Sequence, residues 1–290
     1  MLSRLRAAKY DLVIDMQNQL RSGFVSMVTG APVRIGFDRP RRPVWEFAGE
    51  SLPPGAIKRA WKGAREGSWM AYTHKIQLPT LFLHPVDRYL LAGDMLGVDH
   101  AEANFAIPVR AQAAERVDAL LLERVGAMTK PLILLTPGTL WETKHWLEEG
   151  FAAVARHFLL QGYPVILTGA PNEAEKIQRI ADAAPGVVVL GTSLAEMAAL
   201  MRRCAIVLAN DSGPLHLAMA LGTTALALFG PTNPDWVGPY RRPDLVVRAG
   251  VACSPCFLRD LARCGHDHAC MHGISPERVI GLMQDHLERA

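Results

Sequence analysis

The stretch Ala205–Tyr240, AIVLANDSGPLHLAMALGTTALALFGPTNPDWVGPY, decides the fold that this sequence predicts. It begins with a short apolar run containing β-branched residues, which is typical of a buried parallel strand. The N-D-S-G cluster at 210–213 then turns the chain and begins a helix. Gly222 is suited to end that helix in the left-handed conformation, and a second buried strand, Thr224–Phe229, follows directly. The stretch therefore predicts a βαβ unit whose loops gather at the carboxyl ends of its strands.

This edge of the predicted sheet is also where a ligand is expected. Open α/β sheets bind ligands at the carboxyl ends of their strands, and Pro214 fits the first turn of a helix that begins there. The unpaired N–H groups of such a helix start attract anions, so a diphosphate is the expected guest. In the alternative, Asp211 is only a helix cap and Leu215–Leu221 mostly the core face of a helix. That alternative leaves the later F-G-P-T and G-P-Y segments unexplained.

The ordered pattern D-S-G-P-x-H…A…G…A-L-F-G-P-T-x-P…G-P-Y resembles the bacterial lipopolysaccharide heptosyltransferases of glycosyltransferase family 9. The resemblance extends over nearly the whole chain. Together with the alternation of strands and helices, it implies an α/β fold of the GT-B type, with two Rossmann-like domains facing a cleft. We predict an N-terminal, acceptor-side domain over residues 1–125 and a nucleotide-sugar-binding domain over residues 126–272. A final helix, residues 273–290, is expected to pack back on the N-terminal domain.

The composition fits a soluble globular protein. Half of the 290 residues are hydrophobic and 20% are charged, and the net charge of +3 is too small to indicate nucleic acid as a partner. No run approaches the ~20 apolar residues of a membrane span, and the residues after Met1 lack the apolar segment of a signal peptide. Five cysteines, an odd number, argue against a secreted disulfide framework. The sequence therefore predicts a cytoplasmic protein.

The segment Y-D-L-V-I-D at residues 10–15 predicts a strand and resembles the same family. In that family a strand and a Gly-Asp turn precede this segment, and the aspartate of the turn is the proposed general base. Nothing upstream of Tyr10 matches the turn, so we expect an incomplete N-terminal domain. Asp15, at the carboxyl end of the predicted strand, is the nearby substitute for the base. A helix cap is the more usual role of an aspartate in that position.

Two features suggest contacts on the acceptor side. Residues 34–66 hold eight Lys/Arg and four Asp/Glu, interleaved with Trp45, Phe47 and Trp61. Such a stretch favours contact with an anionic membrane surface or a phosphorylated glycolipid, or it is a solvated loop whose arginines pair locally. The H-P-V-D-R segment resembles a family H-x-V-x-R, so Arg88 could bind an acceptor carboxylate or phosphate. A structural ion pair is the alternative for Arg88.

Two features suggest contacts on the donor side. In T-P-G-T-L-W-E-T-K-H-W, residues 136–146, a strand and a Pro-Gly turn lead to Lys144 just before a helix. The turn offers N–H groups and the lysine a point charge for phosphate; a merely exposed lysine is disfavoured at a helix start by the helix dipole. G-A-P-N-E at 169–173 resembles the family's G-A-x-x-E. Glu173 could accept from ribose hydroxyls or cap the following helix.

The resemblance implies an inverting transfer from ADP-heptose to the lipid A-linked inner core of lipopolysaccharide, at the cytoplasmic face of the inner membrane. Lys144 and the helix start after Asp211 would stabilise the departing diphosphate, with no metal or other cofactor required. Asp211 would repel phosphate, so we expect it to hold backbone N–H groups or a sugar hydroxyl. The expected catalytic residues are Lys144, Asp211 and Asp15, and the expected substrate-binding residues are Thr139, Glu173, Ser212, Gly213, His216, Thr232 and Arg88. For His216, a buried helix histidine is the alternative.

The C-terminal tail carries four cysteines in the spacing C-x2-C-x7-C-x5-C: Cys253, Cys256, Cys264 and Cys270. Four thiolates in so short a stretch could form a small tetrahedral zinc site. Many heptosyltransferase-like chains have a similar tail, although the family needs no metal for catalysis. A structural zinc is therefore an alternative beside our prediction of no metal.

Two rival functions stay open at this point. The chain could be a nucleotide-sugar-binding protein that lost its base with its first βαβ unit, or another GT-B enzyme such as a UDP-sugar transferase or epimerase. A dehydrogenase is disfavoured because no G-x-G-x-x-G follows a strand. A P-loop NTPase is excluded because the chain has no G-x4-G-K-[ST].

Overall fold

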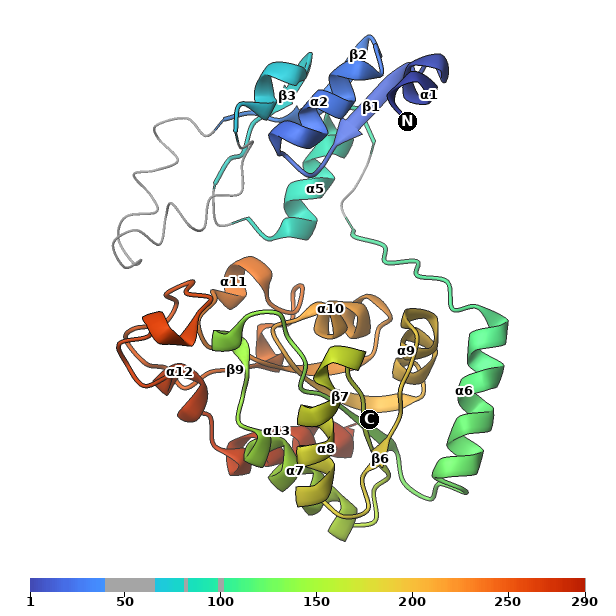
Figure 1. The fold of residues 1–290 in the computed structure, drawn as a ribbon, viewed down its shortest axis with the longest axis vertical. Coiled ribbons are helices and arrows are strands. Elements are labelled where there is room, and N and C mark those ends of the chain that lie inside the picture. Colours follow the sequence, from blue (N-terminus) through green and yellow to red (C-terminus); the bar gives the residue numbers. More distant parts are fainter. Residues whose placement is uncertain (40–65, 81–82, 99–101, 290) are drawn as a thin grey trace. The chain divides into compact units, whose positions relative to one another are not determined.

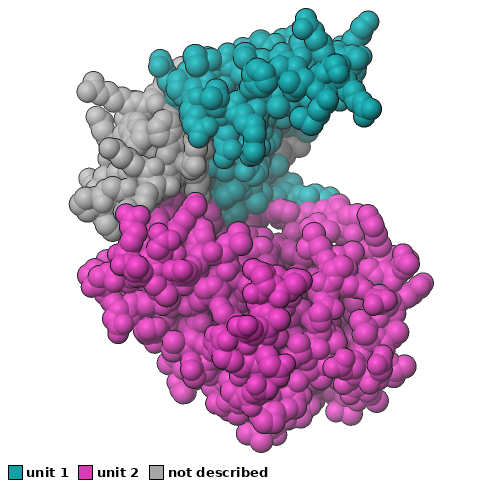
Figure 2. Space-filling model, viewed as in Figure 1, with its two compact units in different colours: residues 1–104 teal, residues 105–290 magenta. Residues whose placement is uncertain are grey.

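The structure is a computed structural model of the chain, and it describes residues 1–39, 66–80, 83–98 and 102–289 (Figure 1). The chain divides into two compact units, residues 1–104 and 105–290 (Figure 2), and each is described by itself. Most of the basic and aromatic stretch at 34–66 lies outside the described residues, including Trp45, Phe47 and Trp61. Among the residues described, no helix has the length and apolar character needed to cross a membrane.

Unit 2 is built on a parallel sheet that has six strands within residues 105–289, in the order β6-β5-β4-β7-β8-β9. These strands are β4 (Leu132–Thr136), β5 (Val165–Leu167), β6 (Val188–Val189), β7 (Cys204–Asn210), β8 (Thr224–Leu228) and β9 (Val246–Val247). The order runs outward from β4 on one side and from β7 on the other. The boundary between β4 and β7 is therefore the point at which the strand order reverses, as in a Rossmann fold.

Helices cover both faces of this sheet, because successive side chains of a strand point to opposite faces. In β4, Ile133 and Leu135 pack into one core cluster, and Leu132 and Leu134 pack into the other. The first cluster is covered by α7 (Glu148–Leu160), α8 (Ala174–Ala183) and α13 (Pro276–Arg289). The second is covered by α6 (Ala111–Arg124), α9 (Leu194–Met201) and α10 (Gly213–Ala220) (Figure 1).

Local sequence signals set two helix ends within unit 2. Ser193 and Glu196 form a capping box at the start of α9, in which the Ser193 N–H donates to Glu196 Oε2 (2.8 Å) and the Glu196 N–H to Ser193 Oγ (3.3 Å). Gly222 follows α10 with a φ of 78°, the left-handed conformation expected of a helix terminator. The short elements of this unit are η2 (Glu142–Lys144), η3 (Pro171–Glu173), α11 (Pro234–Val237), η4 (Pro243–Leu245), η5 (Leu261–Arg263) and α12 (Ala269–His272).

Unit 1 contains a smaller parallel sheet, which has three strands within its described residues, in the order β1-β2-β3. Its elements are α1 (Leu2–Ala7), β1 (Leu12–Asp15), α2 (Leu20–Val28), β2 (Val33–Phe37), η1 (Ser68–Ala71), β3 (His74–Ile76) and α5 (Pro85–Asp94). Its core contains Ile35, Phe37, Ile76 and Ala92. Gly36 lies directly against the ring of Tyr72, and a Cβ added there would come within 2.5 Å of that ring. Only glycine fits this approach without a shift.

The division into compact units follows from helix packing. α6 packs on α9 through Val117 and Leu121, so it belongs to unit 2, and the units divide between residues 104 and 105. α13 packs against α7 and β7 through Val279 and Met283. The expected functional domains, 1–125 and 126–272, and the expected packing of residues 273–290 on the N-terminal domain stay predictions.

Candidate functional site

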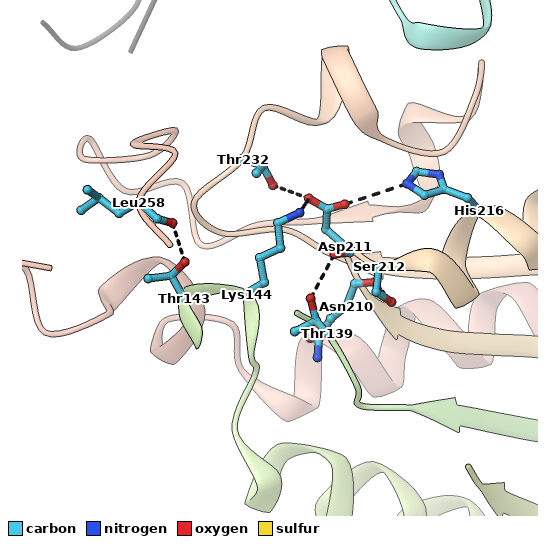
Figure 3. Close-up of polar contacts among 9 residues, drawn as sticks. All are labelled: Thr139, Thr143, Lys144, Asn210, Asp211, Ser212, His216, Thr232 and Leu258. Carbon is cyan, nitrogen blue, oxygen red and sulfur yellow. Dashed lines mark hydrogen bonds and ion pairs between the residues drawn. The ribbon is translucent and has the colours of Figure 1, made fainter. Parts of the chain in front are cut away.

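The centre of the candidate site is an ion pair between Lys144 and Asp211 (Figure 3). Lys144 Nζ lies 2.6 Å from Asp211 Oδ2, and the two side chains are only 13% and 5% exposed. Lys144 ends η2 in the loop after β4, and Asp211 directly follows β7. These two strands are neighbours at the point where the strand order reverses. The pair therefore lies where open α/β sheets bind ligands.

Other predicted residues gather around the Asp211 carboxylate (Figure 3). Thr232 donates its hydroxyl to Asp211 Oδ2 at 2.6 Å, and His216 Nε2 lies 4.0 Å from Oδ1. The Thr139 hydroxyl donates to the main-chain oxygen of Asp211 at 3.4 Å. We expected Asp211 to hold backbone N–H groups or a sugar hydroxyl. In the structure its carboxylate binds the Lys144 ammonium and the Thr232 hydroxyl, because the loops after β4 and β8 end beside it. Contact with a sugar hydroxyl stays a prediction.

The start of α10 lies next to this ion pair. Ser212 is the N-cap residue, but its hydroxyl donates to the main-chain oxygen of Asn210 at 3.1 Å. Within the described part of the chain, no side chain caps α10. Gly213 and Pro214 begin the first turn, and proline has no N–H. The N–H groups of Gly213 and Leu215 have no partner within the helix and are available to an anion. The simple cap interpretation of Asp211 does not match this geometry.

Two buried residues that sequence reasoning missed hold the Lys144 loop in place. Asn210 is fully buried; its Nδ2 donates to the Pro137 carbonyl at 2.8 Å, and its Oδ1 accepts from the Trp146 N–H at 3.3 Å. The Trp146 indole donates to the Ile274 carbonyl at 3.0 Å. The loop that carries Lys144 is thereby tied to β7 at both ends. The sequence marked Asn210 only as a turn residue.

Glu173 lies at the neighbouring strand end, after β5. Its Oε2 accepts from the Ala170 N–H at 2.8 Å, and its carboxyl group fills the space over Gly138. Beside it, Lys176 Nζ donates to His145 Nδ1 at 2.6 Å. Burial and the charge of Lys176 lower the pKa of His145, so the ring is neutral and can accept this bond. The sequence singled out neither His145 nor Lys176.

The two predicted residues of unit 1 are both buried. The Asp15 carboxylate accepts from the Tyr72 hydroxyl at 2.8 Å and from the N–H groups of Gln17 (2.9 Å) and Asn18 (3.3 Å). Burial and the Asp15 bond raise the pKa of Tyr72, so its hydroxyl stays a donor. These bonds hold the turn after β1 and not the start of α2, whose N-cap residue is Gln19, so the helix-cap alternative does not match this geometry. The role of Asp15 as a base stays a prediction.

Arg88, on α5, is 7% exposed. Its guanidinium carbon lies 4.9 Å from the centre of the Tyr89 ring and 5.8 Å from that of Phe37. The side chain therefore packs on aromatic rings within unit 1. Its predicted contact with the acceptor stays a prediction.

The four cysteines of the tail lie near one another. Burial, with the charges of Cys256, Cys253 and Cys264, raises the pKa of Cys270 to about 11. Within the described residues, no group of three or more His, Cys, Asp or Glu side chains is arranged to hold a metal ion. The arrangement therefore gives no support to the zinc alternative.

Breaking the central ion pair should destabilise unit 2. Lys144→Met leaves the buried Asp211 carboxylate uncompensated, and we expect the free energy of unfolding to fall by roughly 3 to 5 kcal/mol. The double variant with Asp211→Asn should recover most of this loss. The exposed pair Arg242–Asp244 gives a matched control, because Arg242→Met should cost about 1 kcal/mol or less. Urea denaturation measures all three variants, and equal losses in the single and double variants would contradict the coupling.

The neutral state of His145 predicts a pH dependence of stability. Its pKa in the folded protein is lowered, so below a pH of about 6.5 the unfolded chain binds a proton that the folded protein does not. The free energy of unfolding should therefore fall as the pH drops from 7.5 to 5.5. This fall should be smaller in His145→Gln than in the wild type. In the exposed control His266→Gln it should be as large as in the wild type. Denaturation curves at the two pH values provide the comparison; identical slopes in wild type and His145→Gln would contradict it.

Comparison with known proteins places this geometry in a family. The model of glycosyltransferase family 9 (heptosyltransferase) matches residues 1–52 and 53–263. Lipopolysaccharide heptosyltransferase 1 of Pseudomonas aeruginosa is 32% identical, over 97% of this chain and 75% of that relative. The lipopolysaccharide core heptosyltransferase OpsX of Haemophilus influenzae is 25% identical, over 84% of this chain and 64% of the relative.

Solved structures agree on the fold. A family 9 glycosyltransferase of Veillonella parvula superposes with a TM-score of 0.76 at 22% identity, over 100% of this chain and 78% of that one. The Escherichia coli heptosyltransferase WaaC, solved with ADP, has a TM-score of 0.69 at 23% identity, over 98% and 75% of the two chains. The predicted α/β fold of the GT-B type is thereby confirmed. The family model and the relative that is 32% identical along almost the whole chain show that this protein belongs to glycosyltransferase family 9, the heptosyltransferase family.

Proposed function

We propose that this chain transfers a heptose from ADP-heptose to the inner core of lipopolysaccharide, with inversion at the anomeric carbon and without a metal ion. The observation that carries the proposal is the buried Lys144–Asp211 pair beside the uncapped start of α10. The family and the names of its curated relatives support heptose as the sugar and lipopolysaccharide as the acceptor. ADP as the carrier is our expectation from the family resemblance.

In this proposal the diphosphate of the donor binds Lys144 and the first N–H groups of α10. Both carry positive charge, so they stabilise the negative charge that grows on the leaving group, and no metal is needed for this task. An acceptor hydroxyl oxygen attacks the anomeric carbon from the opposite side, the bond to the diphosphate breaks, and a carboxylate base takes the hydroxyl proton. Asp211 continues to accept the hydrogen bond from the Thr232 hydroxyl, and its ion pair with Lys144 orients the lysine.

Glu173 has a separate role in the proposal, at the ribose. Its carboxylate lies over Gly138, at the carboxyl ends of β4 and β5. This is the place from which an acidic residue accepts from ribose hydroxyls in other nucleotide-binding folds. Thr139, in the same loop, and His216, beside Asp211, complete the proposed donor contacts.

The acceptor and the location of the reaction belong to the same proposal. A lipid A-linked acceptor would be presented at the cytoplasmic face of the inner membrane, so we propose that the protein works there as a peripheral enzyme. The excess of basic and aromatic residues at 34–66 supports contact with such an anionic surface. Arg88 is the residue that we propose to meet the acceptor in unit 1.

Nucleotide preference tests the donor. ADP at about 100 times its dissociation constant should stabilise the folded state by ~2.7 kcal/mol, enough for a clear thermal shift. We expect a shift with ADP that exceeds those with UDP and GDP. It should be lost in Lys144→Ala and Glu173→Ala, and kept in the exposed controls Lys130→Ala and Glu175→Ala.

The other outcomes of this experiment point to the rival functions. Preference for UDP would indicate a different GT-B enzyme. Selective binding of ADP without transfer of labelled heptose would indicate a nucleotide-sugar-binding protein. No shift with any of the three nucleotides would contradict the proposed donor site.

The general base is tested at Asp15. If Asp15 is the base, Asp15→Asn should abolish transfer while the ADP-induced thermal shift and the melting temperature stay close to wild type. Tyr72→Phe, which keeps the carboxylate and removes its hydroxyl donor, should retain transfer. If Asp15 only caps the turn after β1, Asp15→Asn should lower the melting temperature and transfer together. Initial rates and melting curves of both variants distinguish the two roles.

A further inference from the structure

The C-terminal tail is docked on the loop that carries Lys144. The Thr143 hydroxyl donates to the Leu258 carbonyl at 2.6 Å (Figure 3), and Thr143 is 2% exposed. On the same residue, the main-chain oxygen accepts from His268 Nε2 at 2.7 Å. The Leu261 N–H donates to Glu142 Oε2 at 3.0 Å. The tail residues 258–268 therefore contact η2 at Glu142 and at Thr143, which directly precedes Lys144.

This docking brings a second cation to the aromatic ring that Lys144 contacts. Arg259 directly follows Leu258, and its main-chain oxygen accepts from the Thr143 N–H at 3.4 Å. The Arg259 guanidinium carbon lies 4.7 Å from the centre of the Trp141 ring, and Lys144 Nζ lies 4.4 Å from the centre of the same ring. Two positive charges from segments more than a hundred residues apart thus share one aromatic ring.

The two cations differ in how their charge is balanced. Lys144 is matched by the Asp211 carboxylate at 2.6 Å. Arg259 is exposed and lies on a neutral ring, and no carboxylate pairs with it among the described residues. A nucleoside diphosphate carries more than one negative charge. The Lys144–Asp211 pair is neutral as a unit and the N–H groups of α10 carry only partial charges, so together they leave part of that negative charge unbalanced. The charge of Arg259 is available for that purpose.

The chemistry of the guanidinium suits this task. Stacking on an aromatic face leaves the N–H groups at the edge of the plane available, and their fork matches two oxygens of a phosphate. We propose that Arg259 is a phosphate-binding residue that acts with Lys144 on the diphosphate of the donor. This inference rests on the proposed function, and it gives the docked tail a part in the donor site.

Binding of a nucleotide series tests the inference. Isothermal titration of the full 290-residue chain with ADP, AMP and adenosine should show that Arg259→Gln weakens ADP binding about tenfold, as expected for the loss of one charge-assisted contact. Its effect on adenosine should stay below about twofold. Arg259→Lys should keep part of the ADP affinity, because the charge remains. Arg263→Gln, an exposed arginine of the same tail, is the matched control and should bind ADP like wild type.

Each other outcome is decisive. Equal ADP affinity in Arg259→Gln and Arg263→Gln would overturn the inference while leaving the proposed function in place. An equal loss for ADP and adenosine would show that Arg259 only holds the tail. Unchanged ADP binding with a raised KM for the acceptor would assign Arg259 to an acceptor anion instead. If wild type binds no ADP, the inference and the proposed donor fail together.

Discussion

The buried ion pair between Lys144 and Asp211 is the interaction on which the candidate site depends. Neither charge is tolerable alone at this depth, because removing an ion from water costs several kcal/mol. Each residue therefore requires the other, and the loops after β4 and β7 must end together. The pair also affects how a diphosphate can bind. Lys144 already has a carboxylate partner, so the diphosphate must either compete with Asp211 for the ammonium group or bind it together with Asp211.

The fold meets this requirement through strand order. β4 and β7 are adjacent and parallel although β5 and β6 lie between them in sequence, so their loops meet at one edge of the sheet. Asn210 and Trp146 then fix the β4 loop by hydrogen bonds that leave no polar group of the Asn210 side chain unpaired. The docked tail adds a third support at Thr143. A flexible lysine is thereby held in one geometry before any ligand arrives.

Unit 1 illustrates a different balance. Its described core is small, and the buried Asp15 is satisfied by one hydroxyl and two backbone N–H groups rather than by a cation. Arg88 is likewise packed on aromatic rings. Polar groups that are paired within their own unit stabilise that unit. To act on a substrate, Asp15 or Arg88 would have to give up some of these contacts. The donor side is therefore the better-defined half of the proposed mechanism.

The sequence by itself determined the local elements and marked the residues that we propose for the donor side. The βαβ unit at 205–240, the left-handed Gly222 and the Ser193–Glu196 capping box depend on neighbours within a few residues, and their signals are readable in the chain. The pairing of Lys144 with Asp211, the placement of Glu173 over Gly138, and the sharing of Trp141 by Lys144 and Arg259 were decided only by the tertiary structure. These contacts join segments that strand order and tail docking bring together, and no local pattern records which distant loops will meet.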